Sequence, residues 1–163
     1  MVSRTLVGSA LLAGLSILVA PKPIEACSCV DVARTPEQIA ADFQAEYGRA
    51  VAVFVGRAIS DDAYEATFEV LQVWKGDLGQ RVTLETGVKP ANPDIITVSS
   101  GDIHFAASKT YLVFAYGTKL RMKSQCCSPT HEITSPSAVN ALERLKSFAT
   151  PAPPNPRMEP TRR

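Results

Sequence analysis

The sequence predicts a mainly β fold, a small barrel of about five strands with two flanking helices. Three observations lead to this fold class. The middle of the chain carries a series of short apolar or alternating segments, which are separated by turns containing Gly, Pro and Asn. One amphipathic segment with helix-capping residues precedes this series, and another follows it. A chain of 163 residues, 45% hydrophobic and 20% charged, suffices for one globular domain with a sizeable core.

The first 26 residues have the features of a secretory signal peptide, which is removed from the mature protein. Arg4 provides a positive start, and the apolar run Leu6–Ala20 is shorter than the roughly 20 residues that a membrane-spanning helix needs. Ala26 offers a small residue for cleavage directly before Cys27. An uncleaved anchor and a lipoprotein with a lipidated Cys27 are the alternatives. We therefore expect a secreted protein, extracellular or periplasmic, with no membrane attachment after cleavage.

The mature chain is expected to be electrically neutral. Cleavage after residue 26 removes Arg4, Lys22 and Glu25, so 15 basic and 15 acidic residues remain. A broad nucleic-acid-binding surface needs a basic stripe. The charge balance therefore argues against a nucleic-acid partner.

The first element of the mature chain is predicted to be a helix. Residues 35–38 read Thr-Pro-Glu-Gln, which combines a capping box with a proline at the first helical position. Ile39, Phe43 and Tyr47 follow at a spacing of four, so they share one face of the helix. Gly48 is suited to end it.

The barrel strands are predicted to come next. The first of them, Ala50–Ile59, is apolar on both faces, as in the central strand of a closed or covered sheet. The second, Tyr64–Trp74, alternates, with Phe68, Val70 and Trp74 on one face. The five predicted strands are Ala50–Ile59, Tyr64–Trp74, Arg81–Thr86, Tyr111–Tyr116 and Leu120–Cys126.

The remaining segments complete the domain. Gly87–Asp94 contains two prolines and is expected to be a loop, after which Ile95–Val98 could pair briefly. A second helix is predicted from Ser135 to about Phe148. Its apolar stripe consists of Val139, Leu142 and Leu145.

The chain is thus predicted to have three parts. Residues 1–26 are the signal peptide, residues 27–149 form one domain, and residues 150–163 form a proline-rich disordered tail. The strand and helix count of the domain suits a small barrel such as the OB-fold. A mixed α+β sandwich is the alternative.

Four cysteines form two close pairs in the sequence. Cys27 and Cys29 lie at the predicted mature N-terminus, and Cys126 and Cys127 lie at the end of the last predicted strand. An even number in an exported protein favours disulfides over a redox pair or a metal site. A bridge between the neighbours Cys126 and Cys127 would be strained. The bridges are therefore expected to join the N-terminal segment to the last strand, and to hold still a terminus that would otherwise fray.

A chain terminus that is held still offers two metal-binding atoms. A free α-amino group has a pKa of about 8, so it can lose its proton beside a metal. The carbonyl oxygen of the same residue supplies a second lone pair. Together they can chelate a zinc ion that has an open coordination position. The plainer explanation of the cross-links is the stability of a small secreted domain.

The run Ala26-Cys27-Ser28-Cys29-Val30 resembles the mature start of the tissue inhibitors of metalloproteinases. The resemblance covers roughly residues 27–130, and it is to the inhibitory N-terminal domain as found in short bacterial relatives. It continues in the same order through Val53–Arg57, Phe68–Leu71, Trp74–Gly76, Ser99–Gly101, Phe105, Tyr111–Ala115 and Cys127-Ser128.

This resemblance implies a netrin-like OB-barrel that inhibits zinc metalloendopeptidases and is not itself an enzyme. In the family, the amino group and carbonyl of the first cysteine chelate the zinc of the protease. The next residue enters the pocket for the substrate residue after the scissile bond. These roles would be taken by Cys27 and Ser28, with Cys29 holding the segment and Val30 lying along the cleft. We call residues 27–30 the inhibitory wedge. The zinc belongs to the partner, so the chain is expected to need no cofactor.

The cysteine pattern departs from that of the family. The first cysteine of the family pairs with a position that is Ser100 here. The resemblance implies a bridge between Cys29 and Cys127, which leaves Cys126 as the candidate partner of Cys27. Neighbours on a strand point to opposite faces, so this arrangement requires a local twist or bulge. The alternative function is a secreted netrin-like interaction or adhesion module without inhibitory activity.

Other sites are less well supported by the sequence. His104 and His131 match no standard zinc spacing and are expected to be surface residues. The four cysteines could instead form a thiolate site for copper or zinc. No serine has a convincing base and acid partner in the sequence, so a hydrolase is not expected.

Overall fold

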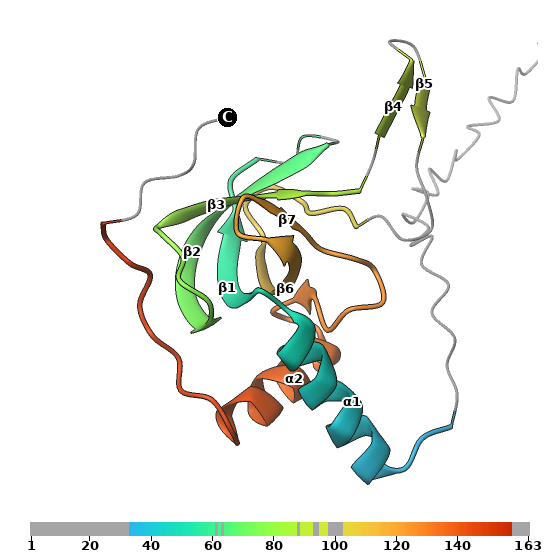
Figure 1. Cartoon of the computed structure of the whole chain (residues 1–163), viewed down its shortest axis with the longest axis vertical. Helices are drawn as coiled ribbons and strands as arrows, with labels where there is room; N and C mark the ends of the chain where they lie inside the picture. Colours follow the sequence, from blue (N-terminus) through green and yellow to red (C-terminus); the bar gives the residue numbers. More distant parts are fainter. Residues whose placement is uncertain are drawn as a thin grey trace, which may run out of the picture.

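The computed structural model describes residues 33–60, 62, 64–87, 89–92, 95–97 and 103–157 (Figure 1). The elements within these residues are, in chain order, α1 Pro36–Arg49, β1 Ala52–Ala58, β2 Glu65–Lys75, β3 Arg81–Glu85, β4 Lys89–Asn92, β5 Ile95–Thr97, β6 Thr110–Thr118, β7 Arg121–Lys123, β8 His131–Glu132 and α2 Pro136–Lys146.

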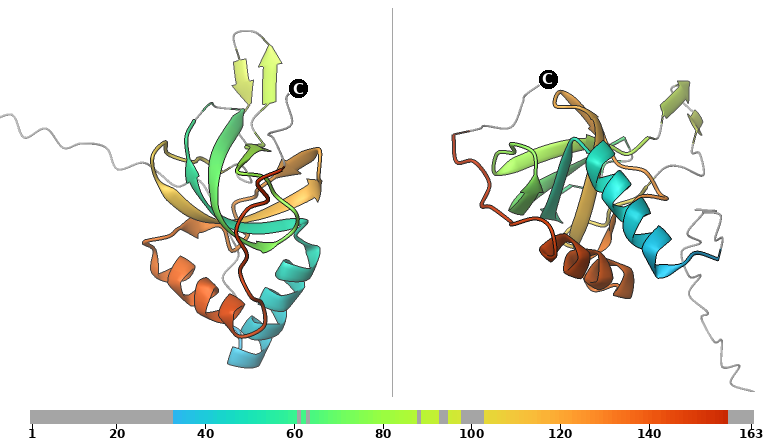
Figure 2. Two further views of the ribbon diagram at one scale, coloured as in Figure 1. Left: turned by 90° about the vertical axis from the view of Figure 1, so that its left-hand side faces the viewer. Right: turned by 60° about the horizontal axis from the view of Figure 1, so that its bottom comes forward.

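Five of the strands close into a barrel. The sheet runs β1–β2–β3–β7–β6, and β6 pairs in turn with β1, which closes the circuit. Every neighbouring pair is antiparallel except β3 with β7, which are parallel and meet at Glu85 and Lys123. Both helices lie at one end of the barrel (Figure 2). The predicted OB-like barrel with two flanking helices is therefore confirmed.

The apolar side chains form two clusters, one inside the barrel and one between the barrel and the helices. β1 contributes to both, as its continuous apolar pattern predicted: Phe54 lies in the inner cluster, and Val53 and Val55 lie in the helix-side cluster. The largest fully buried members of the inner cluster are Phe54, Phe68 and Leu84. Those of the helix-side cluster are Phe114, Leu112 and Leu145.

β2 departs from the simple alternation that its sequence predicted. Trp74 belongs to the helix-side cluster, whereas Val73 joins Phe68 and Val70 inside the barrel. The predicted common face of Phe68, Val70 and Trp74 is therefore wrong. The reason is that the pairing of β2 with β1 shifts register twice, skipping Leu71 and Trp74. Each extra residue in a strand exchanges the faces of the residues that follow.

α1 begins as the sequence predicted. The Thr35 hydroxyl accepts a hydrogen bond from the backbone N–H of Gln38, and the Gln38 side chain accepts one from the backbone N–H of Thr35. The helix ends at Arg49, one residue beyond the predicted end. Phe43 is buried, whereas Ile39 is 38% exposed and lies at the edge of the predicted apolar face.

α1 is fixed to the barrel by polar contacts at its C-terminal end. The Tyr47 hydroxyl donates to the carbonyl oxygen of Trp74 at 2.8 Å. The Lys75 ammonium donates to two carbonyls in the last turn of α1, at 2.6 and 2.8 Å, where a cation also complements the helix dipole. The Tyr116 hydroxyl donates to the Glu46 carboxylate at 2.8 Å. Burial, followed by this hydrogen bond, raises the pKa of Tyr116, so the phenol stays protonated and the contact persists at neutral pH.

α2 packs on the barrel through a stripe slightly different from the predicted one. Leu145 is buried and Leu142 is partly buried against the helix-side cluster, but Val139 is 47% exposed. Ala138 and Ala141 are buried instead, since their small side chains let the helix approach the sheet closely. In the described part of the chain, no helix combines the length and the apolar character needed to cross a membrane.

Strands β4 and β8 were not predicted, whereas the brief pairing expected for Ile95–Val98 is confirmed by β5. Part of the expected loop Gly87–Asp94 is strand β4, which forms an antiparallel hairpin with β5. This hairpin stands away from the barrel (Figure 1). β8 pairs with β6 for two residues. Strands this short leave too few residues for periodicity to be recognised.

The beginning of the predicted disordered tail is paired with the barrel. Ala152 and Val73 exchange two backbone hydrogen bonds of 2.7 and 2.8 Å, and the N–H of Asn155 donates to the carbonyl of Leu78 at 2.7 Å. Ala152 thus pairs with β2 and Asn155 with the turn that follows it, and residues 158–163 fall outside the described part. Prolines lack an N–H, but the residues between them keep theirs and can pair with an open strand edge.

Candidate functional site

The predicted wedge itself, Cys27–Val30, falls outside the described residues, and so does Ser100. The structure does describe the segment to which the wedge is expected to be attached. This segment is residues 124–130, between β7 and β8, and we call it the cysteine loop.

Cys126 and Cys127 occupy the two central positions of a turn in the cysteine loop. The backbone N–H of Ser128 donates to the carbonyl oxygen of Gln125 at 3.1 Å, and the Ser128 hydroxyl donates to the same oxygen at 2.6 Å. The predicted strand Leu120–Cys126 is therefore too long, since β7 ends before the turn. Neighbouring residues in a turn point in different directions. The turn therefore provides the local twist that bridges from both cysteines to the N-terminal segment would require.

Both cysteines of the turn are oxidised. Neither Cys126 nor Cys127 is a free thiol, and each takes part in a disulfide. The Cys126 side chain is buried, and that of Cys127 is exposed. Cys27 and Cys29 lie outside the described residues, so the pairing of the four cysteines stays a prediction.

A buried hydrogen-bond network holds the base of the cysteine loop. Thr130 Oγ1 accepts a hydrogen bond from the backbone N–H of Phe114 at 2.8 Å and lies 2.9 Å from Ser124 Oγ. Ser124 Oγ donates to the carbonyl oxygen of Phe114 at 3.1 Å. The two hydroxyls thus satisfy both backbone groups of one residue of β6. A buried network in which every group is paired specifies one geometry, so the loop leaves the barrel in a defined direction.

We expect Thr130→Val to destabilise the domain by about 1–3 kcal/mol, because the Phe114 N–H then stays buried without this acceptor. The shape of the side chain hardly changes. Urea unfolding of the oxidised mature protein measures the effect. Thr83→Val is the matched control, since the Thr83 hydroxyl pairs with Thr67 Oγ1 on the exposed face of the sheet, and its replacement should change stability by less than about 1 kcal/mol. If the two variants unfold at the same urea concentration, the hydroxyl network does not hold the loop.

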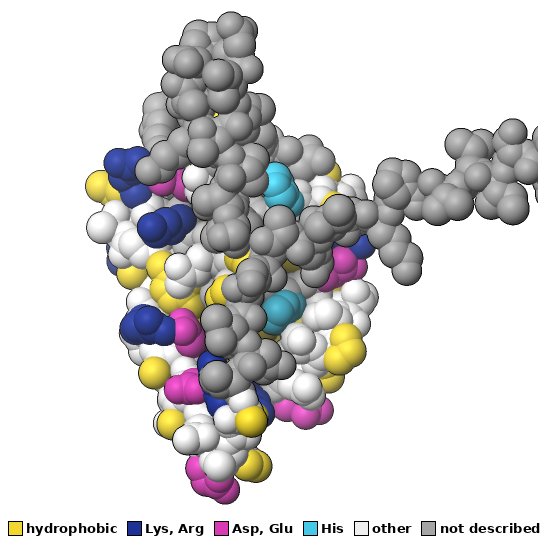
Figure 3. Space-filling model, turned by 90° about the vertical axis from the view of Figure 1, so that its right-hand side faces the viewer, with side chains coloured by type: hydrophobic (Ala, Val, Ile, Leu, Met, Phe, Trp, Pro, Cys, Tyr) yellow, Lys and Arg dark blue, Asp and Glu magenta, His cyan; other side chains and the backbone are white. Residues whose placement is uncertain are grey.

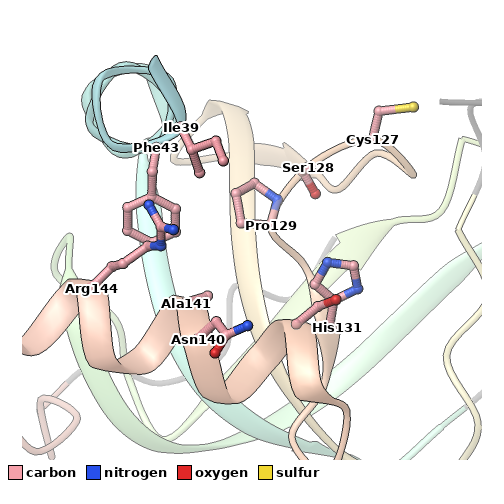
Figure 4. Close-up of a pocket in the computed structure, with 10 residues that line it drawn as sticks. Ile39, Phe43, Cys127, Ser128, Pro129, His131, Asn140, Ala141 and Arg144 are labelled. Carbon is pink, nitrogen blue, oxygen red and sulfur yellow. The ribbon is translucent and has the colours of Figure 1, made fainter. Parts of the chain in front are cut away.

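An open groove lies beside the cysteine loop, on the side of the helices (Figure 4). It has a volume of about 340 Å³. α1, the cysteine loop, β8 and α2 contribute its lining residues, which are Ile39, Phe43, Cys127, Ser128, Pro129, His131, Ser137, Asn140, Ala141 and Arg144. No sequence motif indicated this groove, because its residues come from four separate elements.

The histidines differ in their surroundings. His104 is exposed, as predicted, whereas His131 is half-buried in β8 and lines the groove. Within the described ranges, no group of three or more His, Cys, Asp or Glu side chains could hold a metal ion. Figure 3 shows the face on which histidine side chains are visible, where basic and acidic side chains are interspersed outside the grey atoms.

The fold and the site define a small OB-like barrel with a disulfide-bonded turn beside its last barrel strand. No family model matches the chain, and neither curated proteins nor solved structures give a significant match.

Proposed function

We propose that the mature chain is a secreted inhibitor of zinc metalloendopeptidases. The amino group and carbonyl oxygen of Cys27 would bind the catalytic zinc of the target. The observation that carries this proposal is the turn at Gln125–Ser128, which presents two disulfide-bonded cysteines side by side. With Cys27 and Cys29 as their partners, two adjacent bridges would anchor the chain terminus to a loop whose base is buried.

The chemistry of the proposed wedge follows from its position at a free terminus. An α-amino group with a pKa of about 8 loses its proton readily beside a zinc ion. The Cys27 nitrogen and carbonyl oxygen then close a chelate at the open position of the protease zinc. The small Ser28 side chain would enter the adjacent pocket without a clash, and Val30 would lie along the cleft. The chain supplies only ligand atoms, and the zinc belongs to the partner.

The rigidity of the two elements to which the N-terminal segment is proposed to be joined supports the proposal. One is the cysteine loop, whose base is held by the buried Ser124 and Thr130 hydroxyls. The other is α1, which is capped by Thr35 and fixed to the barrel by Lys75 and Tyr116. A segment that is ordered before binding loses less conformational entropy when it meets a protease.

The proposal predicts that inhibition requires Cys27 to be the first residue. We would titrate a panel of zinc metalloproteases with oxidised protein that starts at Cys27, and with a variant carrying one extra alanine ahead of it. The extra residue blocks the amino group, so the inhibition constant should rise roughly 100-fold or more, which corresponds to about 2.8 kcal/mol. A variant with one extra alanine after Arg163 is the control and should inhibit like the unextended protein.

The other outcomes separate the competing functions. Equal inhibition by both N-terminal forms would mean that the chain blocks proteases through another surface. If neither form inhibits any protease, while spectroscopy and mass analysis confirm the fold and both disulfides, the result would favour a secreted netrin-like interaction module without inhibitory activity.

A further inference from the structure

The groove beside the cysteine loop combines apolar side chains with hydrogen-bond donors, and these residues have no role in the proposed inhibition. One part of its lining is apolar, formed by Ile39 and Phe43 of α1 together with Pro129. The other part carries hydrogen-bond donors, among them Asn140 and Arg144 of α2. These two residues are four apart, so they lie on the same face of the helix. The Arg144 side chain extends from α2 toward α1 (Figure 4).

Arg144 brings a positive charge that the described part of the chain does not neutralise. None of the described residues that line the groove is acidic, and Arg144 forms no ion pair with any other of these described residues. Three carboxylates on α1 and β8, which border the groove, are engaged by other cations. These pairs are Asp42 with Arg34, Glu46 with Arg49, and Glu132 with Lys109.

We propose that this groove binds the C-terminal residue of a peptide whose last side chain is apolar. A guanidinium binds a carboxylate through two parallel hydrogen bonds, which suits Arg144 for the terminal carboxylate. The apolar side chain would pack against Ile39, Phe43 and Pro129. A terminal residue carries both groups on one carbon atom, whereas an acidic side chain offers the carboxylate alone. The volume of about 340 Å³ is at the small end for ligand sites, which suits one terminal residue better than a long segment.

The test uses the oxidised mature protein and a fluorescein-labelled pentapeptide that ends in leucine, with binding followed by fluorescence anisotropy. The same peptide with a C-terminal amide should bind about tenfold more weakly or worse, because it lacks the charge that Arg144 recognises. Arg144→Gln should weaken binding of the acid peptide by a similar factor. Lys146→Gln removes the same charge from an exposed position on α2 outside the groove, and should leave binding unchanged.

Four results would overturn this assignment. The first is equal binding of the acid and amide peptides, and the second is equal binding by the two α2 variants. The third is no binding of the acid peptide at millimolar concentration. An amidated peptide with an internal glutamate that binds as tightly as the acid peptide would also overturn it, because the ligand would then be a side-chain carboxylate. No protease is present in this assay. A negative result would therefore contradict the peptide-binding proposal without bearing on the inhibition proposal, which is tested separately.

Discussion

Phe68→Ala is expected to destabilise the barrel by about 3–5 kcal/mol. Phe68 is fully buried in the inner cluster. Its ring makes edge-on contacts with Phe54, Phe105 and Tyr111, with centroid separations of 5.7, 4.9 and 6.3 Å. Alanine would leave a cavity that the surrounding closed sheet can fill only in part, and would remove all three ring contacts. A domain of this size has about 5–15 kcal/mol of stability, so the loss would be a large share.

Guanidinium unfolding of the oxidised protein, followed by fluorescence of the single tryptophan, measures this loss. Leu71→Ala is the matched control, because Leu71 lies on the same strand but is 49% exposed. Its replacement should cost less than about 1 kcal/mol. Phe68→Leu keeps most of the apolar volume and should fall between the two. An equal loss for Phe68→Ala and Leu71→Ala would show that the inside of the barrel is not the main core.

Removal of both proposed disulfides is expected to cost about 4–5 kcal/mol, whereas removal of one should cost much less. Either bridge between the N-terminal pair and the cysteine turn closes a loop of roughly 100 residues, and the chain entropy lost by the unfolded state depends mainly on the first closure. The second bridge adds little, because its ends are already held together. The effect is therefore expected to be strongly non-additive.

This expectation is tested with three proteins. They are the oxidised mature chain, a variant with Cys29→Ser and Cys127→Ser, and a variant with all four cysteines replaced by serine. Denaturant unfolding should give a small loss for the first replacement and most of the loss for the second. Two equal losses would argue against bridges that close the same loop. Peptide mapping of the oxidised chain by mass spectrometry identifies the pairs directly, and a bridge between Cys126 and Cys127 would contradict the proposed anchoring of the terminus.

The elements that were predicted correctly depend on interactions between residues close in sequence. The capping box at Thr35 and Gln38 uses hydrogen bonds within one helical turn. β1 was recognised because the run from Ala50 to Val55 places apolar side chains on both faces, which only a covered sheet can bury. The barrel follows from five short strands, since closing the sheet pairs the edges that they would otherwise expose.

The candidate site could be predicted only in part. The cysteines were visible in the sequence, but their placement in a turn depends on where β7 stops pairing with β6. The groove could not be predicted, because Ile39, Pro129 and Arg144 are brought together by the packing of helices on the barrel.

Strand register explains why the faces of β2 could not be predicted from its own residues. Its alternating pattern identified a strand, but the face of Trp74 depends on register shifts against β1. Register is set by side chains on both strands at once, and a single extra residue exchanges every later position. The pairing of Ala152 with Val73 depends in the same way on a strand edge that is distant in the chain. Local sequence therefore sufficed for the kind and order of the main elements, whereas contacts between distant segments decided their register, the turn that carries the cysteines and the groove beside it.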